Sequence, residues 1–298
     1  MNICLAVFCY NREKHLKSTL DALLQNPNIR EYPINFFIDG PVKKEDEDKI
    51  SRVYNLINAF DHSKKFIIRR HKNIGLADNI ITGLNHSFKT HDAVIVLEDD
   101  VVVNEHFLNY MVTSLCAYSN DDNVWHISAW SPITHIKKNV AYFSHRMACS
   151  GGWATWKRAW KHFNRDVEII DSLQSLFFQS FDPNKKFGYK KQLIYNKKNI
   201  IKTWGIYWSL IIFMKKKLCL NPLNSFTKNI GFDGSGVHSN KSTSYNNLVI
   251  SGIYPIEFPN NVDVNKFYTK EYENALVKLG YTSLVTRIIN KIKKLLGL

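Results

Sequence analysis

The chain has 298 residues and a formal net charge of +14. Its hydrophobic content of 45% with 13% aromatic residues excludes an intrinsically disordered protein. Its five cysteines are odd in number and lack Cys-x-x-Cys spacing, which argues against a disulfide framework or a zinc site and indicates a reducing cytoplasm. We expect no signal peptide, because the apolar run at 3–9 is short and has no basic leader.

The charge is divided unevenly along the chain. Residues 1–130 contain 14 Lys and Arg against 17 Asp and Glu, whereas residues 131–298 contain 26 against 9. A basic second half favours an anionic partner: a phosphorylated substrate, an anionic membrane or a nucleic acid. The alternative is that an A/T-rich genome enriches lysine without any such partner.

Two hydrophobic patterns alternate along the first 130 residues. Short apolar runs predict strands, and apolar residues spaced by three and four predict helices between them. The predicted strands are residues 3–9, 34–39, 66–69, 93–97 and 124–128. This alternation predicts a doubly wound, mostly parallel α/β sheet with right-handed crossovers.

The acidic triplet Glu98-Asp99-Asp100 directly follows the fourth predicted strand. Three adjacent carboxylates repel one another, and their burial costs free energy unless a cation is present. Ligands of α/β proteins collect at the carboxyl ends of parallel strands, where these acids would lie. The pattern therefore favours a divalent cation bound to phosphates over a solvated acidic turn.

The alternation breaks after residue 131. Residues 142–144 predict a short strand, and residues 153–160 predict a tryptophan-rich helix. Trp204 and Trp208 fall on a second such helix. Aromatic residues at helical spacing more often form core than ligand platforms, but tryptophans beside glycines also suit stacking on a sugar ring.

Two segments nearer the C-terminus have patterns of their own, one rich in glycine and one basic and amphipathic. Residues 229–238 include three glycines, which predicts either a loop that closes over a ligand or an ordinary turn. Residues 284–298 form a basic amphipathic pattern. Such a helix lies on an anionic membrane or packs against the protein's own core, and the overall basicity favours the membrane.

Several motifs occur together in a characteristic order. They are residues 8–12 (FCYNR), 73–79 (NIGLADN), 94–101 (VIVLEDDV), 106–110 (HFLNY), 124–130 (VWHISAW), 151–153 (GGW) and 159–160 (AW). The pattern resembles the GT-A class of nucleotide-sugar glycosyltransferases, near the bacterial family-two type. Its central part is also similar to animal N-acetylglucosaminyltransferase I.

The resemblance implies a role for each acid of the triplet. Asp100 would bind Mn²⁺ or Mg²⁺ directly, Asp99 would hydrogen-bond the ribose or the donor sugar, and Glu98 would support both. A hard cation bridging two phosphates stabilises the charge that develops on a departing diphosphate.

The resemblance also implies contacts to the nucleotide sugar. Asn11 and Arg12 follow the first strand, Asp39 would accept the uracil N3–H, and Asn73 and Asn79 would close the base and ribose pocket. Helix capping is the alternative for each asparagine, and a solvated surface charge is the alternative for Arg12. We add Trp153, next to the Gly151-Gly152 pair, as a sugar contact.

One departure from the family pattern concerns the catalytic base. An inverting transferase needs a carboxylate to accept the proton of the acceptor hydroxyl. Relatives carry an acid just before the tryptophan that matches Trp204, but this chain has Lys202-Thr203. Asp233 is the best remaining candidate, and His238 would act as base or contact the diphosphate.

These observations predict a metal-dependent glycosyltransferase of the GT-A fold. Residues 1–130 would form its nucleotide-sugar-binding half, residues 131–260 its acceptor-side half and residues 261–298 a helical tail. It would transfer a sugar from a UDP-linked or other nucleotide sugar to a glycan or lipid-linked acceptor for bacterial surface polysaccharide, in the cytoplasm at the inner face of the membrane. A nucleotidyltransferase is the enzymatic alternative, and a catalytically reduced basic module for membrane or nucleic acid is the other; we expect no specific nucleic acid partner, because no such motif is present.

Overall fold

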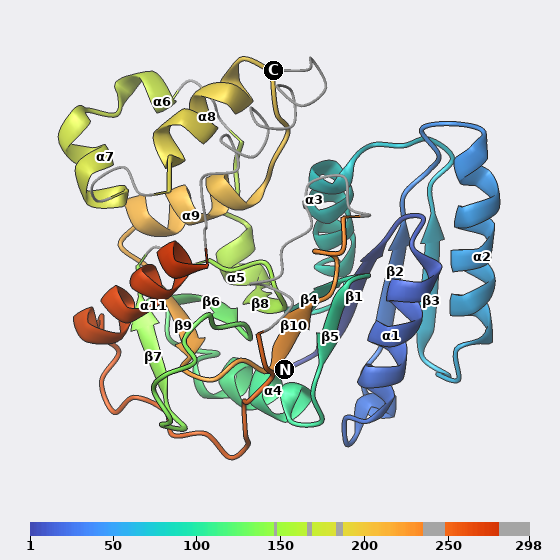
Figure 1. Cartoon of the computed structure of the whole chain (residues 1–298), viewed down its shortest axis with the longest axis horizontal. Coiled ribbons are helices and arrows are strands. Elements are labelled where there is room, and N and C mark those ends of the chain that lie inside the picture. Colours follow the sequence, from blue (N-terminus) through green and yellow to red (C-terminus); the bar gives the residue numbers. More distant parts are fainter. Residues whose placement is uncertain (146–147, 166–168, 183–186, 235–247, 280–298) are drawn as a thin grey trace.

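A computed structural model describes residues 1–145, 148–165, 169–182, 187–234 and 248–279 (Figure 1). The predicted α/β architecture is confirmed: one large sheet lies between helices on both faces. The predicted C-terminal helix at 284–298 and His238 lie outside the described residues. No helix in the described ranges combines the length and hydrophobicity needed to cross a bilayer.

The strands are β1 (Ile3–Cys9), β2 (Ile34–Ile38), β3 (Lys65–Arg69), β4 (Ala93–Glu98), β5 (Val101–Val103), β6 (Val124–Ser128), β7 (Ala141–Ser144), β8 (Trp153–Trp156), β9 (Leu218–Pro222) and β10 (Thr227–Asn229). The helices are α1 (Glu13–Leu24), the 3₁₀ helix η1 (Ile29–Glu31), α2 (Glu45–Ala59), α3 (Leu76–Ser87), α4 (Phe107–Ala117), α5 (Lys157–Trp160), α6 (Ile169–Ser172), α7 (Ser175–Phe181), α8 (Tyr189–Lys197), α9 (Gly205–Met214) and α11 (Lys266–Lys278).

The eight-stranded sheet has the order β3-β2-β1-β4-β8-β6-β9-β7. The first four strands pair in parallel, as predicted. Strand β8 then pairs antiparallel with both β4 and β6, so the fifth predicted strand does not lie beside the fourth. The prediction of a helix beginning at residue 153 was wrong: residues 153–156 are this inserted strand, and α5 begins only at Lys157.

The side chains of β1 alternate between the two faces of the sheet. Ile3, Leu5, Val7 and Cys9 belong to the hydrophobic layer that includes residues of α1, α2 and α4, whereas the intervening residues belong to the layer that includes residues of α3, α5 and α9. Every residue of β1 is buried, as expected for a strand covered on both faces. Two hydrophobic layers therefore fix the carboxyl end of β1 beside that of β4.

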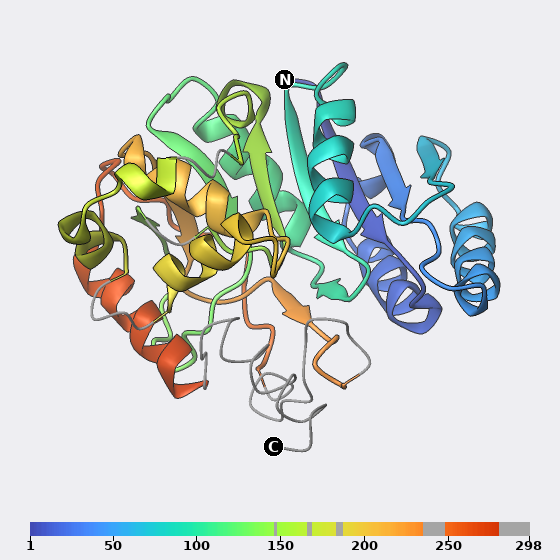
Figure 2. The ribbon, with the colours of Figure 1, turned by 90° about the horizontal axis from the view of Figure 1, so that it is seen from above.

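The later helices lie on the side of the sheet away from β1–β3 (Figures 1 and 2). Helix α11 packs against β7, where the rings of Tyr268 and Tyr142 have centroids 5.5 Å apart. Its N-cap, Asn265, accepts a hydrogen bond from the Tyr268 backbone N–H at 3.0 Å and donates its own N–H to the Phe143 carbonyl. These contacts hold α11 in one orientation over this end of the sheet.

Candidate functional site

The acidic triplet lies at the carboxyl end of β4, as predicted. Asp99 is 7% exposed, and its carboxylate accepts a hydrogen bond from the Tyr10 backbone N–H at 3.0 Å, just after β1. The Thr19 hydroxyl on α1 donates to the Asp99 carbonyl at 3.0 Å. Asp99 therefore joins the ends of two neighbouring parallel strands.

Asp100 is held from both sides. Its Oδ2 accepts a hydrogen bond from Arg12 Nη1 at 2.6 Å, and its Oδ1 accepts one from Asn229 Nδ2 at 3.0 Å. The antiparallel pairing of β10 with β5 sets Asn229 opposite Val101 and thus beside Asp100. The structure therefore brings the predicted residues Arg12 and Asp100 into direct contact.

Gly231 is the residue that allows the loop after β10 to approach this carboxylate. A Cβ on Gly231 would lie 2.0 Å from Asp100 Oδ2 and 2.8 Å from Arg12 Nη1. Any side chain there would displace the pair. The absence of a side chain at Gly231 thus lets the loop pack directly against the Asp100 carboxylate and Arg12.

The three acids titrate unusually in this environment. Burial, and then the charges of the neighbouring acids, raise the pKa of Glu98 to about 8 and that of Asp99 to about 7. Burial also raises the pKa of Asp100, although the Arg12 cation opposes this rise. A further positive charge at the triplet would stabilise all three ionised forms.

These side chains fit a divalent cation that is bound together with phosphates. The described residues contain no cluster of three or more His, Cys, Asp or Glu side chains arranged to hold a metal alone. Mg²⁺, however, is usually bound through one or two carboxylates plus substrate phosphates. A single carboxylate such as Asp100 satisfies that requirement.

Asp39 and Asn73 organise the loop before α3. The Asp39 carboxylate accepts hydrogen bonds from the backbone N–H groups of Gly40, Ile74 and Gly75 at 2.8–2.9 Å. Asn73 donates to the Gly40 carbonyl at 2.8 Å. Both side chains therefore fix the loop that lies at the carboxyl end of β2, and Asn73 does not cap a helix.

Asn79 and Asn11 also make specific contacts without capping. Asn79 is 1% exposed, donates to the Phe37 carbonyl and accepts from Arg70 Nε at 2.7 Å. Asn11 donates to Asp46 at 3.0 Å, and the Tyr10 hydroxyl donates to the same carboxylate at 2.8 Å. Asp46 on α2 is thus a partner of the first motif that the sequence reasoning missed.

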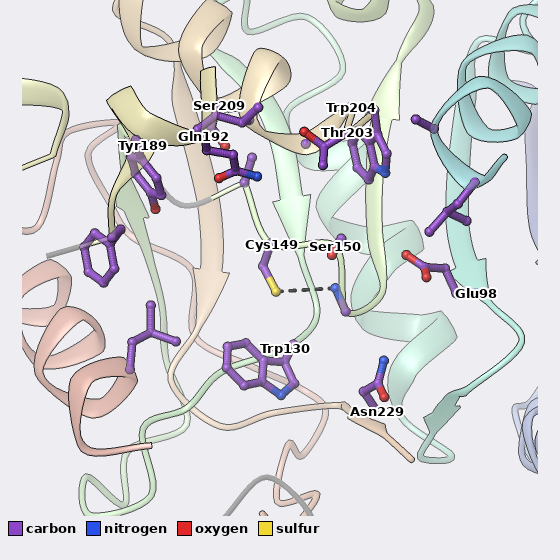
Figure 3. Close-up of a pocket in the computed structure, with 18 of the residues that line it drawn as sticks. Glu98, Trp130, Cys149, Ser150, Tyr189, Gln192, Thr203, Trp204, Ser209 and Asn229 are labelled. Carbon is purple, nitrogen blue, oxygen red and sulfur yellow. Dashed lines mark hydrogen bonds between the residues drawn. The ribbon is translucent and has the colours of Figure 1, made fainter. Parts of the chain in front are cut away.

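A pocket of about 370 Å³ opens beside the triplet (Figure 3). Glu98 and Asn229 line one side of it, and Tyr189 and Gln192 from α8 line the opposite side. Trp130 lies at its base. Its volume and its mixture of aromatic and polar side chains are typical of small-molecule sites.

The other predicted contacts lie in different surroundings. Trp153 is 1% exposed, and its indole stacks on Trp204 at 4.8 Å between ring centroids, so it packs in the core. Trp130 and Trp204 are the tryptophans that reach the pocket among the described residues. The carboxylate of Asp233 is 45% exposed and lies 3.0 Å from His15 and 3.9 Å from Arg12.

The position where an acid was expected is occupied by an ion pair. Lys202 binds Asp78, in the first turn of α3, and Arg165 binds the same carboxylate. Lys202 and Thr203 line the pocket at the start of α9. This cluster therefore joins the start of α3 to the segment that leads into α9, and both helices border the pocket at their N-termini.

The sequence matches a known protein family over most of its length. Residues 4–200 match the family described as Glycosyl transferase family 2, a range that contains the acidic triplet and strands β2–β8, whereas β9, Asn229 and Glu273 lie beyond it. The chain belongs to glycosyl transferase family 2. The predicted glycosyltransferase class is thereby confirmed, whereas the similarity to N-acetylglucosaminyltransferase I stays a prediction.

The solved structures that resemble this family 2 transferase share little sequence identity with it. The mannosyltransferase PcManGT from Pyrobaculum calidifontis, in complex with GDP-Man and Mn²⁺, is 12% identical, with 72% of this chain and 69% of that chain covered and a TM-score of 0.40. S. aureus TarS 1–349 in complex with UDP-GlcNAc is 9% identical, with 76% and 58% covered and a TM-score of 0.45. The chain thus spans less than two thirds of that TarS fragment, and no curated protein matches it.

Proposed function

We propose that this transferase moves a sugar from a nucleotide sugar, most simply a UDP-sugar, to a glycan or lipid-linked glycan in bacterial surface polysaccharide synthesis. The observation that carries the proposal is the Asp100 carboxylate, fixed between Arg12 and Asn229 beside a pocket of about 370 Å³. Family membership supplies the reaction class. The pocket has the size for a hexose or an N-acetylhexosamine.

Asp100 would hold Mn²⁺ or Mg²⁺, with the remaining ligand positions filled by the donor diphosphate and water. The bound cation would stabilise the negative charge that develops on the departing diphosphate. Arg12, which lies against Asp100, would add a second positive charge at the same place. Asp99 would keep the end of β4 in register with Tyr10.

The nucleoside would lie over the loop at the carboxyl end of β2. Asp39 has three backbone donors, so its first effect is to shape this loop, and a remaining lone pair would accept the uracil N3–H. Asn73 and Asn79 donate to backbone carbonyls around this loop, and Asn11 donates to the Asp46 side chain. The same loop therefore supports the base and the ribose.

The test uses the purified full chain with UDP-glucose, UDP-galactose, UDP-GlcNAc and GDP-mannose. Thermal shift measures binding, and release of UDP or GDP measures turnover, each with Mn²⁺, with Mg²⁺ and with EDTA. We expect at least one donor to raise Tm and to be cleaved in the presence of metal. Failure of every donor to bind or react, or equal turnover in EDTA, contradicts the proposal.

We propose further that the protein works in the cytoplasm on the inner face of the cell membrane. The basic second half of the sequence, with a net charge of +17, supports attraction to anionic lipid. Full-length protein should sediment with phosphatidylglycerol vesicles and not with phosphatidylcholine vesicles. A chain ending at Tyr281 that sediments equally well contradicts the role of residues 284–298.

A further inference from the structure

The structure places three carboxylates near the pocket in addition to the triplet: Asp78, Asp233 and Glu273. A transferase with an acceptor hydroxyl needs one carboxylate to receive the hydroxyl proton when the reaction inverts the anomeric configuration. The sequence places Lys202-Thr203 where that acid was expected. The surroundings of the three carboxylates distinguish them.

Asp78 is a poor base in this structure. Burial alone would raise its pKa, but the Lys202 ammonium and the Arg165 guanidinium outweigh burial and hold that pKa below its usual value. A carboxylate stabilised by two cations has little affinity for a proton. Asp78 therefore positions Lys202 and Arg165.

Asp233 does not line the pocket, although its neighbour Phe232 does. Its carboxylate approaches His15 and Arg12, both of which belong to the face of α1 and the loop before it. It is also nearly half exposed. These contacts suit a group that orients Arg12 near the diphosphate.

Glu273 differs from both, because it is a buried acid that lines the pocket. It is 7% exposed and comes from α11, on the acceptor side of the sheet. Tyr272, Glu273 and Leu276 line the pocket together, as expected for one face of a helix. Among the described residues that line the pocket, the acids are Glu98, at the end of β4, and Glu273.

The support of Glu273 is rigid. The Tyr272 ring meets the Trp130 ring edge to face, with centroids 6.0 Å apart, and Trp130 also lines the pocket. The cap at Asn265 ties the start of α11 to β7. A carboxylate carried on such a helix keeps its position relative to the pocket.

We propose that Glu273 is the base that activates the acceptor, and this inference rests on the proposed transferase function. The acceptor, a sugar hydroxyl or water, gives its proton to the Glu273 carboxylate as its oxygen forms a bond to the anomeric carbon of the donor sugar. The bond from that carbon to the diphosphate oxygen breaks, and the electron pair leaves with the diphosphate. The aromatic lining from Trp130, Tyr189 and Tyr272 would hold the faces of the acceptor ring.

The test compares E273Q and E273D with a matched variant on the same helix, E271Q. Glu271 hydrogen-bonds His135 at the surface, and it is not one of the described residues that line the pocket. With the cleaved donor from the panel above, E273Q should lower kcat at least a hundredfold. Donor-induced thermal shift should stay within about 1 °C of wild type, E273D should retain intermediate turnover, and E271Q should match wild type.

The outcomes separate this inference from the proposed function. E273Q with wild-type turnover overturns the assignment, and loss of turnover in D233N in the same series would move the base to Asp233. If E273Q does not fold, wild-type kcat in E273D overturns the assignment instead. A wild-type protein that binds and cleaves no donor overturns the function and this inference together.

Discussion

Arg12 Nη1 lies 2.6 Å from Asp100 Oδ2, so the residue that follows β1 neutralises the acid that follows β4. This cation opposes the rise that burial imposes on the pKa values of all three acids. The pair thus sets the pH at which the triplet ionises.

Replacing Arg12 by alanine should therefore move the acidic limb of kcat/KM to higher pH. The carboxyls would hold their protons more tightly without the guanidinium, and kcat/KM at pH 7 should fall at least tenfold. Arg52, which pairs with Glu13 and Asp48 at the surface, provides the control R52A. An unchanged limb in R12A would contradict the electrostatic role.

The stabilisation by metal and nucleotide should depend on pH. The folded-state pKa values of Glu98 and Asp99 are raised to about 8 and about 7. The unfolded chain therefore loses these protons first, and the free energy of unfolding falls as pH rises from about 4 to about 8. Because a cation binds the ionised acids, the Tm increase produced by Mn²⁺ with UDP should be larger at pH 8 than at pH 6, and D99N should weaken this dependence. An equal Tm increase at pH 6 and pH 8 in the wild-type protein would contradict this prediction.

G231A should disrupt the site without unfolding the protein. The new Cβ would meet Asp100 Oδ2 at 2.0 Å and force the carboxylate away from Arg12. We expect turnover to fall at least tenfold and the metal concentration needed for half-maximal activity to rise. The circular dichroism spectrum serves as the folding control, and wild-type kinetics in G231A would show that the loop adapts freely.

W153F should weaken the fold more than it weakens donor binding. Trp153 is buried between Trp204 and His126, and truncation of such a residue to alanine costs about 3–5 kcal/mol. Phenylalanine should lower the free energy of urea unfolding by less than that and leave the donor Kd nearly unchanged. Unchanged stability with lost donor binding would instead support the predicted sugar contact.

The strands of the first half could be predicted because their signals are local. Five apolar side chains at residues 93–97 predict a buried strand. Similar short apolar runs predict the parallel strands β1, β2 and β3. Strand β8 could not be predicted in this way. Its residues are buried as a strand because β4 and β6 accept it between them, and that pairing depends on segments far apart in the sequence.

The residues of the site also differ in whether the local sequence could predict them. Asp100 stood out because three acids follow an apolar strand, and its contact with Arg12 lies where the ends of β1 and β4 meet. Asn229 was noticed only as part of a glycine-rich loop, because the pairing of β10 with β5 decides which residue faces Asp100. Glu273 gave no signal, since a single glutamate in a mixed helix looks like a surface residue until the packing of α11 is known.

The most direct test of the account is the metal dependence of D100N. Asparagine keeps the size of the side chain and a hydrogen bond acceptor for Arg12 but removes the charge that holds the cation. With the donor that the wild type cleaves, D100N should lose turnover at least a hundredfold across Mn²⁺ concentrations while its Tm without ligand stays at or above that of wild type. Turnover in D100N that equals wild type and still requires Mn²⁺ would contradict the assignment of Asp100 as the metal ligand.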